Sequence, residues 1–372
     1  MSRKTRMSAG NKFTLGLFAP NCDGGMAITT APERWRATWD NNRALARLAD
    51  EVGLEFLLPV ARWIGFGGRS EFQRNSLETL TWAEGVLSES KRLMAFGTIH
   101  APLIHPIVAA KQMATIDHVS DGRFGVNVVC GWNDPEFRMF GLVQREHDDR
   151  YAYGQEWLDV VRTLWRSEEP TSFNGEYFQL PDLIGRPGPW GDTEPPMMNA
   201  GFSEAGRDFA SRNCDFLFTT FVDHDQGRKD VAEIKRATKQ KYNLSIDLLT
   251  VAYVICRPTT KEAQAFHDYY AAEVADGEAT DRLIELQGLH AKSFPPDFDF
   301  QAFRQRFAGG HGSYPIIGTP DEVAAEIARL SEDGYSGMAF SLVDYLAELP
   351  YLGEELIPRL EALRLREPES RG

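Results

Sequence analysis

A single amide side chain interrupts an apolar stretch of the sequence at residues 122–132. Asn127 stands between Val126 and Val128, in a run whose composition predicts a buried β-strand. Strand side chains alternate between two faces, so both valines point one way and Asn127 points the other way, with Gly125. A buried amide without a partner costs free energy, so we expect Asn127 to serve a flat ligand on this face. The alternative is a core asparagine bonded to neighbouring backbone.

Two further segments have residue types that could bind a phosphate group. Residues 199–206 read Asn-Ala-Gly-Phe-Ser-Glu-Ala-Gly and run from a predicted strand through Gly201 to Ser203, which can cap the next helix. Free backbone N–H groups, a positive helix end and a hydroxyl favour a phosphate. Arg150 and Tyr151 stand at another predicted helix start, where the guanidinium could bind the same phosphate. Ser203 by itself would indicate only a helix cap, but the two segments together predict a phosphate site.

The elements that must position these residues follow a βα pattern. Short apolar runs alternate with longer segments of helical periodicity, which is typical of a parallel sheet. Eight strands alternating with helices predict a closed (β/α)₈ TIM barrel. The alternative is an open doubly wound sheet, but the turn at residues 20–25 lacks the GxGxxG spacing of dinucleotide sites. The strands are predicted at residues 13–20, 55–61, 93–100, 123–130, 197–200, 216–219, 248–256 and 337–342.

The active site of such a barrel lies at the carboxyl ends of its strands. This rule selects Ala61 and Arg62 after the second predicted strand and Thr98 on the third. It also selects the loop after the fourth strand, which contains Glu136. We expect Glu136 to hold a ligand N–H or Arg150, and the alternative is an exposed loop carboxylate.

Three other features have weaker signals. Residues 65–68, Gly-Phe-Gly-Gly, would let the backbone approach a planar ring or would simply form a flexible turn. His100, His105 and His118 lie near one face of the predicted barrel, but no metal-ligand spacing links them, so we expect no metal site. The 4 cysteines are far apart in the sequence and are predicted to be free thiols in a reducing compartment.

We expect one elaborated domain. Residues 13–365 would form the barrel, after a flexible tail at residues 1–12. Two stretches do not fit the βα repeat. Residues 167–196, rich in Pro, Gly and aromatics, are predicted to fold as an insertion over one end of the barrel. Residues 280–314, with a Phe-Pro-Pro and a Gly-Gly sequence, are predicted to form a mobile loop, and either insertion could be a lid over the C-terminal face.

Charge and hydropathy exclude several classes of protein. The 40 basic and 54 acidic side chains give a formal net charge of −14, which argues against broad binding to nucleic acid or to an anionic membrane. The N-terminal residues are polar, without the apolar stretch of a signal peptide, and no run approaches the ~20 apolar residues that cross a bilayer. We therefore expect a cytoplasmic protein.

Several motifs of this sequence resemble those of a known family. The chain is similar to the bacterial-luciferase-like flavin monooxygenases, and within them to the group of pyrimidine oxygenases and of dimethyl-sulfone and alkanesulfonate monooxygenases. The resemblance spans nearly all of the predicted barrel. Its densest motifs are Gly65-Phe66-Gly67-Gly68, Ala114-Thr115-Ile116-Asp117, Gly122-Arg123-Phe124-Gly125-Val126-Asn127, Gly131-Trp132, Pro135-Glu136, Arg150-Tyr151, and Ala200-Gly201 with Ser203.

This resemblance implies reduced FMN as the cofactor. Thr98 and Asn127 match the pair that is thought to bind dioxygen beside the flavin in the pyrimidine oxygenase, which implies a flavin peroxide as the oxidant. It also implies a separate NAD(P)H:flavin reductase as a partner, a small polar substrate and a homodimer or homotetramer. The residues implied to contact FMN are Ala61, Arg62, Asn127, Glu136, Arg150, Tyr151 and Ser203, and they agree with the phosphate end reasoned above, which adds Gly201.

The chain departs from the pyrimidine oxygenase at two places. It has Ala61-Arg62 followed by Trp63 where that oxygenase has Ile-Lys, and its early loop at residues 21–26 looks more like the sulfone and alkanesulfonate monooxygenases. A uracil-like heterocycle or amide is the favoured substrate and an organosulfur compound the alternative. Rival interpretations are a deazaflavin-dependent oxidoreductase of the same fold, a non-catalytic luciferase-like subunit and a metal-dependent barrel hydrolase.

Overall fold

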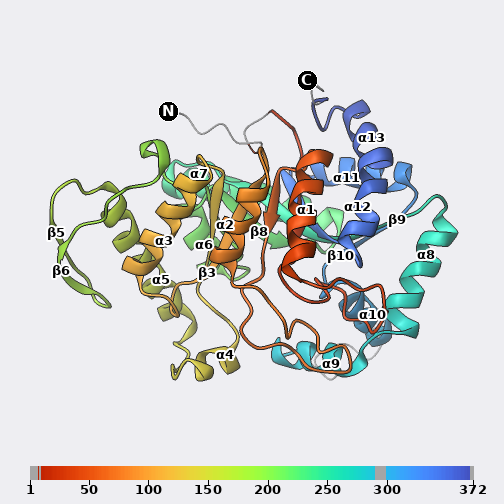
Figure 1. The fold of residues 1–372 in the computed structure, drawn as a ribbon, viewed down its shortest axis with the longest axis horizontal. Helices are drawn as coiled ribbons and strands as arrows, with labels where there is room; N and C mark the ends of the chain where they lie inside the picture. Colours follow the sequence, from red (N-terminus) through yellow and green to blue (C-terminus); the bar gives the residue numbers. More distant parts are fainter. Residues whose placement is uncertain (1–6, 8–9, 290–298, 369–372) are drawn as a thin grey trace.

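The computed structural model describes residues 7, 10–289 and 299–368. In it, strands with alternating apolar side chains form a parallel sheet that closes into a barrel. Strand β9 pairs with both β8 and β11, which completes the barrel that runs in order from β1 through β2, β3, β4, β7 and β8 (Figure 1). The predicted (β/α)₈ TIM barrel is confirmed. Its strands are β1 (Thr14–Phe18), β2 (Phe56–Leu58), β3 (Met94–His100), β4 (Phe124–Val129), β7 (Met197–Asn199), β8 (Phe216–Thr220), β9 (Asp247–Cys256) and β11 (Gly337–Ser341).

The helices that surround the barrel begin where the sequence supplies capping side chains. Thr38 caps α1, Ser203 caps α6, and Thr319 with Glu322 forms a capping box at α11. The helices outside the two insertions are α1 (Trp39–Val52), α2 (Thr79–Glu89), α3 (Pro106–Val119), α4 (Asp134–Met139), α5 (His147–Arg166), α6 (Glu204–Asn213), α7 (His224–Tyr242), α8 (Thr260–Asp268), α11 (Pro320–Glu332), α12 (Tyr345–Tyr351) and α13 (Ile357–Ala362).

Strand alternation produces two cores. Val126 and Val128 of β4 belong to the large cluster between the barrel and its helices. A second cluster fills the lumen and includes Phe96 of β3. Gly125 faces this cluster, because a Cβ atom there would lie 2.6 Å from the Phe96 ring. Asn127 therefore also faces the lumen, as the alternation of the sequence predicts.

The segment at residues 167–196 lies along the flank of the barrel rather than across its end. Strands β5 (Thr171–Asn174) and β6 (Gln179–Leu183) form an antiparallel hairpin outside α5 (Figure 1). Glu156 of α5 accepts hydrogen bonds from the backbone N–H groups of Tyr177, at 2.8 Å, and Phe178, at 2.6 Å. These bonds hold the hairpin turn against α5.

The prediction of a loop at residues 280–314 is wrong over the part that the structure describes. This part belongs to α9 (Gly277–Leu286) and α10 (Phe300–Gly310), and β10 (Tyr314–Gly318) then pairs with the end of β9. Gly309 lies so close to Tyr253 that a Cβ atom would stand 2.9 Å from its ring. The glycines that suggested a loop are thus packing positions in a helix. Residues 290–298, with the Phe-Pro-Pro sequence, and most of the predicted N-terminal tail lie outside the described residues.

Candidate active site at the carboxyl ends of the strands

Asn127 of β4 lies beside Thr98 of β3, its partner in the strand register. Its Nδ2 donates to Thr98 Oγ1 at 3.2 Å, and the Thr98 hydroxyl donates to the Pro59 carbonyl at 2.6 Å. Because Pro59 takes the only hydroxyl hydrogen, Thr98 Oγ1 can only accept, which fixes the orientation of the Asn127 amide. Asn127 Oδ1 is buried and has no hydrogen-bond partner among the described residues. Asn127 therefore presents an open acceptor.

His100 is the next residue on the lumen face of β3. Its side chain is 7% exposed, and its Nδ1 is buried with no hydrogen-bond partner in the described part of the chain. Burial lowers the pKa of His100 to about 4, with Glu136 opposing the shift and Arg62 adding to it, so the imidazole is neutral near pH 7. His100 and Thr98 line a pocket whose other walls are Ala61, Arg62, Trp63, Ser76, Leu77, Glu78, Thr79, Leu103 and Ile104.

From the sequence, His100 is predicted only not to bind a metal, and its place in the pocket is not predicted. The signal that could have found it was available, because strand alternation places residue 100 on the same face as Thr98 and at the carboxyl end of the strand.

Arg62 and Glu136 form a buried ion pair, with Arg62 Nη1 at 3.3 Å from Glu136 Oε1. The same oxygen accepts hydrogen bonds from the backbone N–H groups of Trp63, at 2.8 Å, and Ile64, at 3.2 Å. Glu136 is therefore neither an exposed carboxylate nor the partner of Arg150. It holds the loop after β2 in place, and the guanidinium of Arg62 lies over the ring of Phe66.

The predicted phosphate site is built from the starts of α5 and α6. Ser203 Oγ accepts from the Gly206 N–H at 3.1 Å and also forms a hydrogen bond with the hydroxyl of Tyr151 in α5. Burial raises the pKa of Tyr151, so this hydroxyl stays protonated near neutral pH. The Gly201 N–H donates to Asn199 Oδ1 at 2.8 Å, which shapes the turn before the helix. Tyr151, Gly201 and Ser203 thus meet at one helix start.

Arg150 lies in the first turn of α5, directly before Tyr151. Its Nη1 donates to the Gly131 carbonyl at 2.7 Å, which ties α5 to the loop after β4. Its Nε is buried and has no partner among the residues that the structure describes. A guanidinium with an N–H left over beside a helix start is suited to bind an anion. We call Asn127 Oδ1, His100 Nδ1 and Arg150 Nε the open polar atoms.

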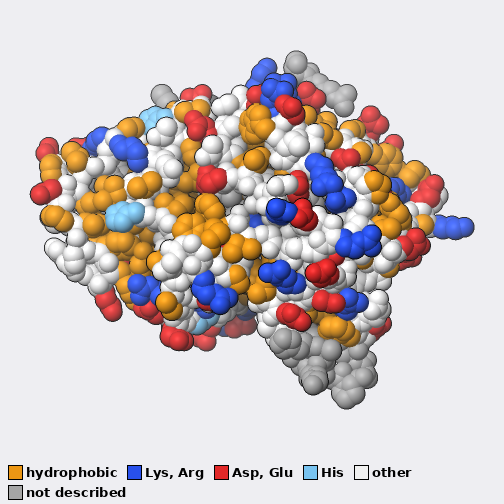
Figure 2. All heavy atoms as spheres, turned by 60° about the horizontal axis from the view of Figure 1, so that its bottom comes forward, with side chains coloured by type: hydrophobic (Ala, Val, Ile, Leu, Met, Phe, Trp, Pro, Cys, Tyr) orange, Lys and Arg blue, Asp and Glu red, His pale blue; other side chains and the backbone are white. Residues whose placement is uncertain are grey.

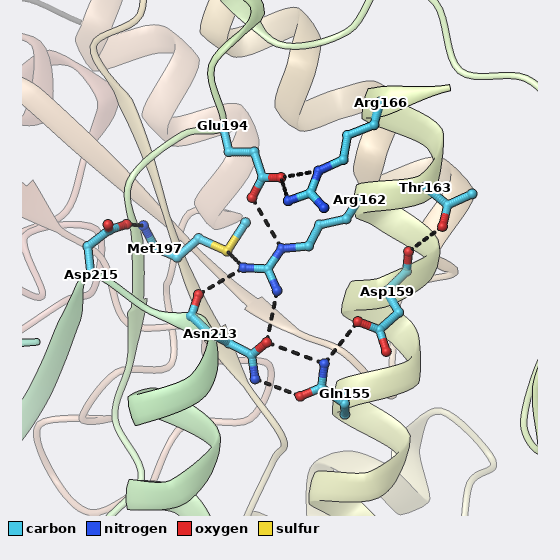
Figure 3. Close-up of polar contacts among 9 residues, drawn as sticks. All are labelled: Gln155, Asp159, Arg162, Thr163, Arg166, Glu194, Met197, Asn213 and Asp215. Carbon is cyan, nitrogen blue, oxygen red and sulfur yellow. Dashed lines mark hydrogen bonds and ion pairs between the residues drawn. The ribbon is translucent and has the colours of Figure 1, made fainter. Parts of the chain in front are cut away.

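A hydrogen-bond network at the other ends of α5 and α6 fixes how these helices lie against each other (Figure 3). Arg162 of α5 donates to the Asn213 side chain at 2.8 Å and to its carbonyl at 2.9 Å, where α6 ends. Its Nε donates to Glu194 at 3.1 Å, and Arg166 donates to the same carboxylate at 2.8 Å. Gln155 and Asn213 exchange amide hydrogen bonds. The network therefore fixes the two helices whose starts form the predicted phosphate site.

The glycine-rich stretch at residues 65–68 is anchored rather than free. Gly67 and Gly68 have φ angles of +74° and +70°, which favour glycine. A Cβ atom on Gly68 would lie 2.5 Å from the carboxylate of Asp276, which caps α9. This contact positions the loop after β2 against α9.

The described ranges of the chain contain neither a candidate metal site nor a candidate membrane-spanning helix. No group of three or more His, Cys, Asp or Glu side chains there could hold a metal ion. No helix within those ranges is long and apolar enough to span a membrane. The four cysteines are free thiols, as predicted, and all are buried.

The chain is similar to several monooxygenases. The chain is 29% identical to the FMNH(2)-dependent dimethylsulfone monooxygenase of Pseudomonas putida, over 93% of this chain and 94% of that protein. It is also 29% identical to the pyrimidine monooxygenase RutA of Stutzerimonas stutzeri, over 94% and 97%. Among solved structures, the long-chain alkane monooxygenase LadA matches with a TM-score of 0.85 at 21% identity, covering 100% of this chain and 94% of LadA.

The profile of the luciferase-like monooxygenases matches residues 13–337. The chain belongs to this family, which confirms the family that the motifs predicted. The structural likeness to LadA at this identity supports the fold alone.

Proposed function

We propose that this protein is a reduced-FMN-dependent monooxygenase that uses dioxygen and receives its reduced flavin from a separate NAD(P)H:flavin reductase. The names of the relatives support this proposal, because one is an FMNH(2)-dependent monooxygenase and another a pyrimidine monooxygenase. The structural observation that supports the proposal most is Asn127 Oδ1, a buried acceptor in the lumen without a partner among the described residues. It lies at the same end of the barrel as the predicted phosphate site at Ser203.

The residues present fit FMN at both of its ends. Asn127 Oδ1 is suited to accept a hydrogen bond from a ring N–H. The positive start of α6 favours a phosphate, and the Tyr151 and Ser203 hydroxyls, which form a hydrogen bond with each other, could turn toward it. Arg150 Nε, which has no partner among the described residues, would add a charged donor. When bound, reduced FMN would supply the two electrons that put one atom of dioxygen into the substrate and the other into water.

The roles of the chain's own residues follow from their hydrogen bonds. Thr98 gives its hydrogen to Pro59, so we assign it the positioning of the Asn127 amide. The N–H of Asn127 that does not reach Thr98 is the donor that would meet dioxygen. Arg62 and Glu136 hold the loop after β2 over the pocket, and Ala61 lines that pocket.

The substrate is proposed to be a small polar molecule, with a uracil-like heterocycle or an amide favoured over an organosulfur compound. The charge of Arg62 is compensated by Glu136, and His100 is neutral. These groups therefore favour an uncharged substrate over an anion.

A panel of oxygenation assays tests the proposal. Oxygen consumption with reduced FMN is measured in the presence of uracil, dimethyl sulfone and methanesulfonate, and products are identified by mass. We expect oxygen-dependent product from an uncharged compound and none when reduced deazaflavin replaces reduced FMN. Hydride transfer from deazaflavin without oxygen uptake would contradict the proposal, and failure of the purified protein to retain flavin would favour a non-catalytic subunit.

We also propose that the protein forms a homodimer or homotetramer. Figure 2 shows hydrophobic side chains gathered on the side of the molecule where α3 and α5 lie. Exposed apolar residues of these segments include Val108 of α3, 51% exposed, and Val143 before α5, 89% exposed. Apolar patches of this kind often mark interfaces. Light scattering on the purified protein would give the mass, and a monomer at micromolar concentration would contradict this proposal.

A further inference from the structure

We propose that His100 contacts the substrate and selects an uncharged molecule that carries both a hydrogen-bond donor and an acceptor, as an amide or lactam does. This inference rests on the proposed function and adds to it a residue and a recognition rule.

The position of His100 carries the inference. It ends β3 on the lumen face, follows Thr98 along that face and lines the same pocket, beside the loop of Arg62. Its side chain is more than nine-tenths buried, and its Nδ1 is one of the open polar atoms. A buried ring nitrogen costs free energy unless a hydrogen-bond partner reaches it, so the pocket is built for a partner that the bound molecule supplies.

His267 Nδ1 is also buried without a partner among the described residues, but His267 does not line the pocket, so the pocket position is what distinguishes His100. Two other histidines have structural roles. Both ring nitrogens of His224 contact carboxylates, with Nδ1 at 2.5 Å from Asp333 and Nε2 at 2.8 Å from Glu326. His118 Nε2 lies 2.9 Å from the Gly188 carbonyl. These histidines bridge elements of the fold, whereas His100 points its ring into a pocket.

The chemistry of the ring defines the ligand class. A neutral imidazole has its N–H donor and its acceptor nitrogen on different edges of the ring, so His100 Nδ1 either donates or accepts according to the tautomer. An amide or lactam, which has both a C=O and an N–H, can pair with Nδ1 in either tautomer. Burial keeps the pKa of His100 low, and the charges nearest to it belong to Arg62 and Glu136, which neutralise each other. Glu78, also in the pocket wall, is engaged with the N–H groups that begin α2. An anion would therefore lose its hydration in this pocket without gaining an opposite charge.

The test compares two variants with matched probes. His100→Leu removes both hydrogen-bonding groups at similar size, and His100→Asn restores a donor and an acceptor. KM is measured for uracil and dimethyl sulfone, and inhibition for methanesulfonate. His118→Leu, on the outer surface of α3, is the control.

We expect His100→Leu to raise KM for uracil by about tenfold or more, as the loss of hydrogen bonds predicts. The control His118→Leu should keep both the KM for uracil and the rate of flavin-dependent oxygen uptake within about twofold of the parent. We expect His100→Asn to recover part of the KM, a smaller effect on dimethyl sulfone, which has acceptors only, and no inhibition by methanesulfonate.

Three outcomes would overturn the inference: an unchanged KM in His100→Leu, tight binding of methanesulfonate, or failure of every uncharged probe to bind. The proposed function is checked first in the same samples by anaerobic binding of reduced FMN and its oxidation by oxygen. If the parent protein fails that check, the proposed function fails. If it passes and the probes ignore His100, the inference alone fails.

Discussion

Two arginines of α5 differ in how many of their guanidinium nitrogens have hydrogen-bond partners. Arg162, near the end of α5, satisfies every nitrogen of its guanidinium with Glu194, Asn213 and the sulfur of Met197 (Figure 3). Arg150, at the start of α5, donates to the Gly131 carbonyl but is left with an open Nε. The same helix therefore carries a closed network at one end and an open group at the other.

The difference separates stability from function. Buried polar groups are normally hydrogen-bonded, and the network of Arg162 follows this rule. The open polar atoms depart from it and lie at the carboxyl ends of the strands or in the first turn of α5. Other buried atoms without a partner among the described residues, such as His267 Nδ1 in α8 and Ser331 Oγ in α11, lie outside the site. We infer that the hydrogen-bond network of Arg162 stabilises the fold and that the open polar atoms bind a ligand.

The largest expected effect is on catalysis. Asn127→Leu removes the amide at nearly constant size, and a donor aimed at developing charge is worth ~3 kcal/mol, so product formation should fall by about 100-fold. Its stability to heat should stay close to that of the parent, because the loss of the hydrogen bond to Thr98 is offset by removal of a buried acceptor that has no partner among the described residues. Product yield and thermal unfolding are measured together. An active variant, or one that unfolds far earlier, would erase the difference between the two regions.

Removing hydrogen bonds from the Arg162 network should lower stability more than product formation. Arg162→Met removes hydrogen bonds to the buried Asn213 and to Glu194, which is 27% exposed and keeps its bond to Arg166, and this should lower the free energy of unfolding by about 2 kcal/mol. The matched control is Arg166→Met. That side chain is 67% exposed and pairs with the same carboxylate, so its loss should cost under ~1 kcal/mol. Denaturant unfolding measures both, and equal losses would contradict the account.

The titration of His100 gives a smaller, pH-dependent effect. Its pKa of about 4 in the folded protein lies below the ordinary 6.5, so between these values the unfolded chain binds more protons. Stability should therefore rise with pH across this window, with a slope from His100 of ~1.4 kcal/mol per pH unit, and should not change above it. His100→Gln should show a shallower fall on acidification. Identical acid sensitivity in parent and variant would mean that His100 is not buried and neutral.

The smallest expected effect is at the predicted phosphate site, where Ser203 caps α6. Ser203→Gly should cost a few tenths of a kcal/mol in stability, since glycine is a tolerable helix cap, yet weaken reduced FMN binding by about fivefold. Reduced riboflavin, which has no phosphate, serves as the matched ligand and should bind parent and variant equally. A parallel loss for both ligands would place Ser203 outside the phosphate contact.

The sequence predicted the barrel because its periodicities are local. The strands at Asn127 and Thr98 have clear alternation, and the helix start at Ser203 has a capping side chain, so element type and facing could be inferred together. The helix α10 was missed because Gly309 and Gly310 suggest a loop. Only the distant ring of Tyr253, which packs on them, explains glycine there.

The site was predictable where a residue acts through its own element. Glu136 was recognised as important, but its partner Arg62 lies far away in sequence, and nothing local indicated that the carboxylate would bind the N–H groups of Trp63 and Ile64. His100 had a readable position on its strand, but the missing partner of its Nδ1 became visible only when the surrounding loops were placed.

The central claim is that the open end of the barrel binds reduced FMN with its phosphate at Arg150 and the start of α6. Anaerobic titration of parent and Arg150→Met with reduced FMN and reduced riboflavin tests it most directly. We predict that the parent prefers reduced FMN by about 10- to 100-fold, the range of charged hydrogen bonds, and that Arg150→Met loses most of this preference. Equal affinity of the parent for both flavins, or an unchanged preference in Arg150→Met, would contradict the account.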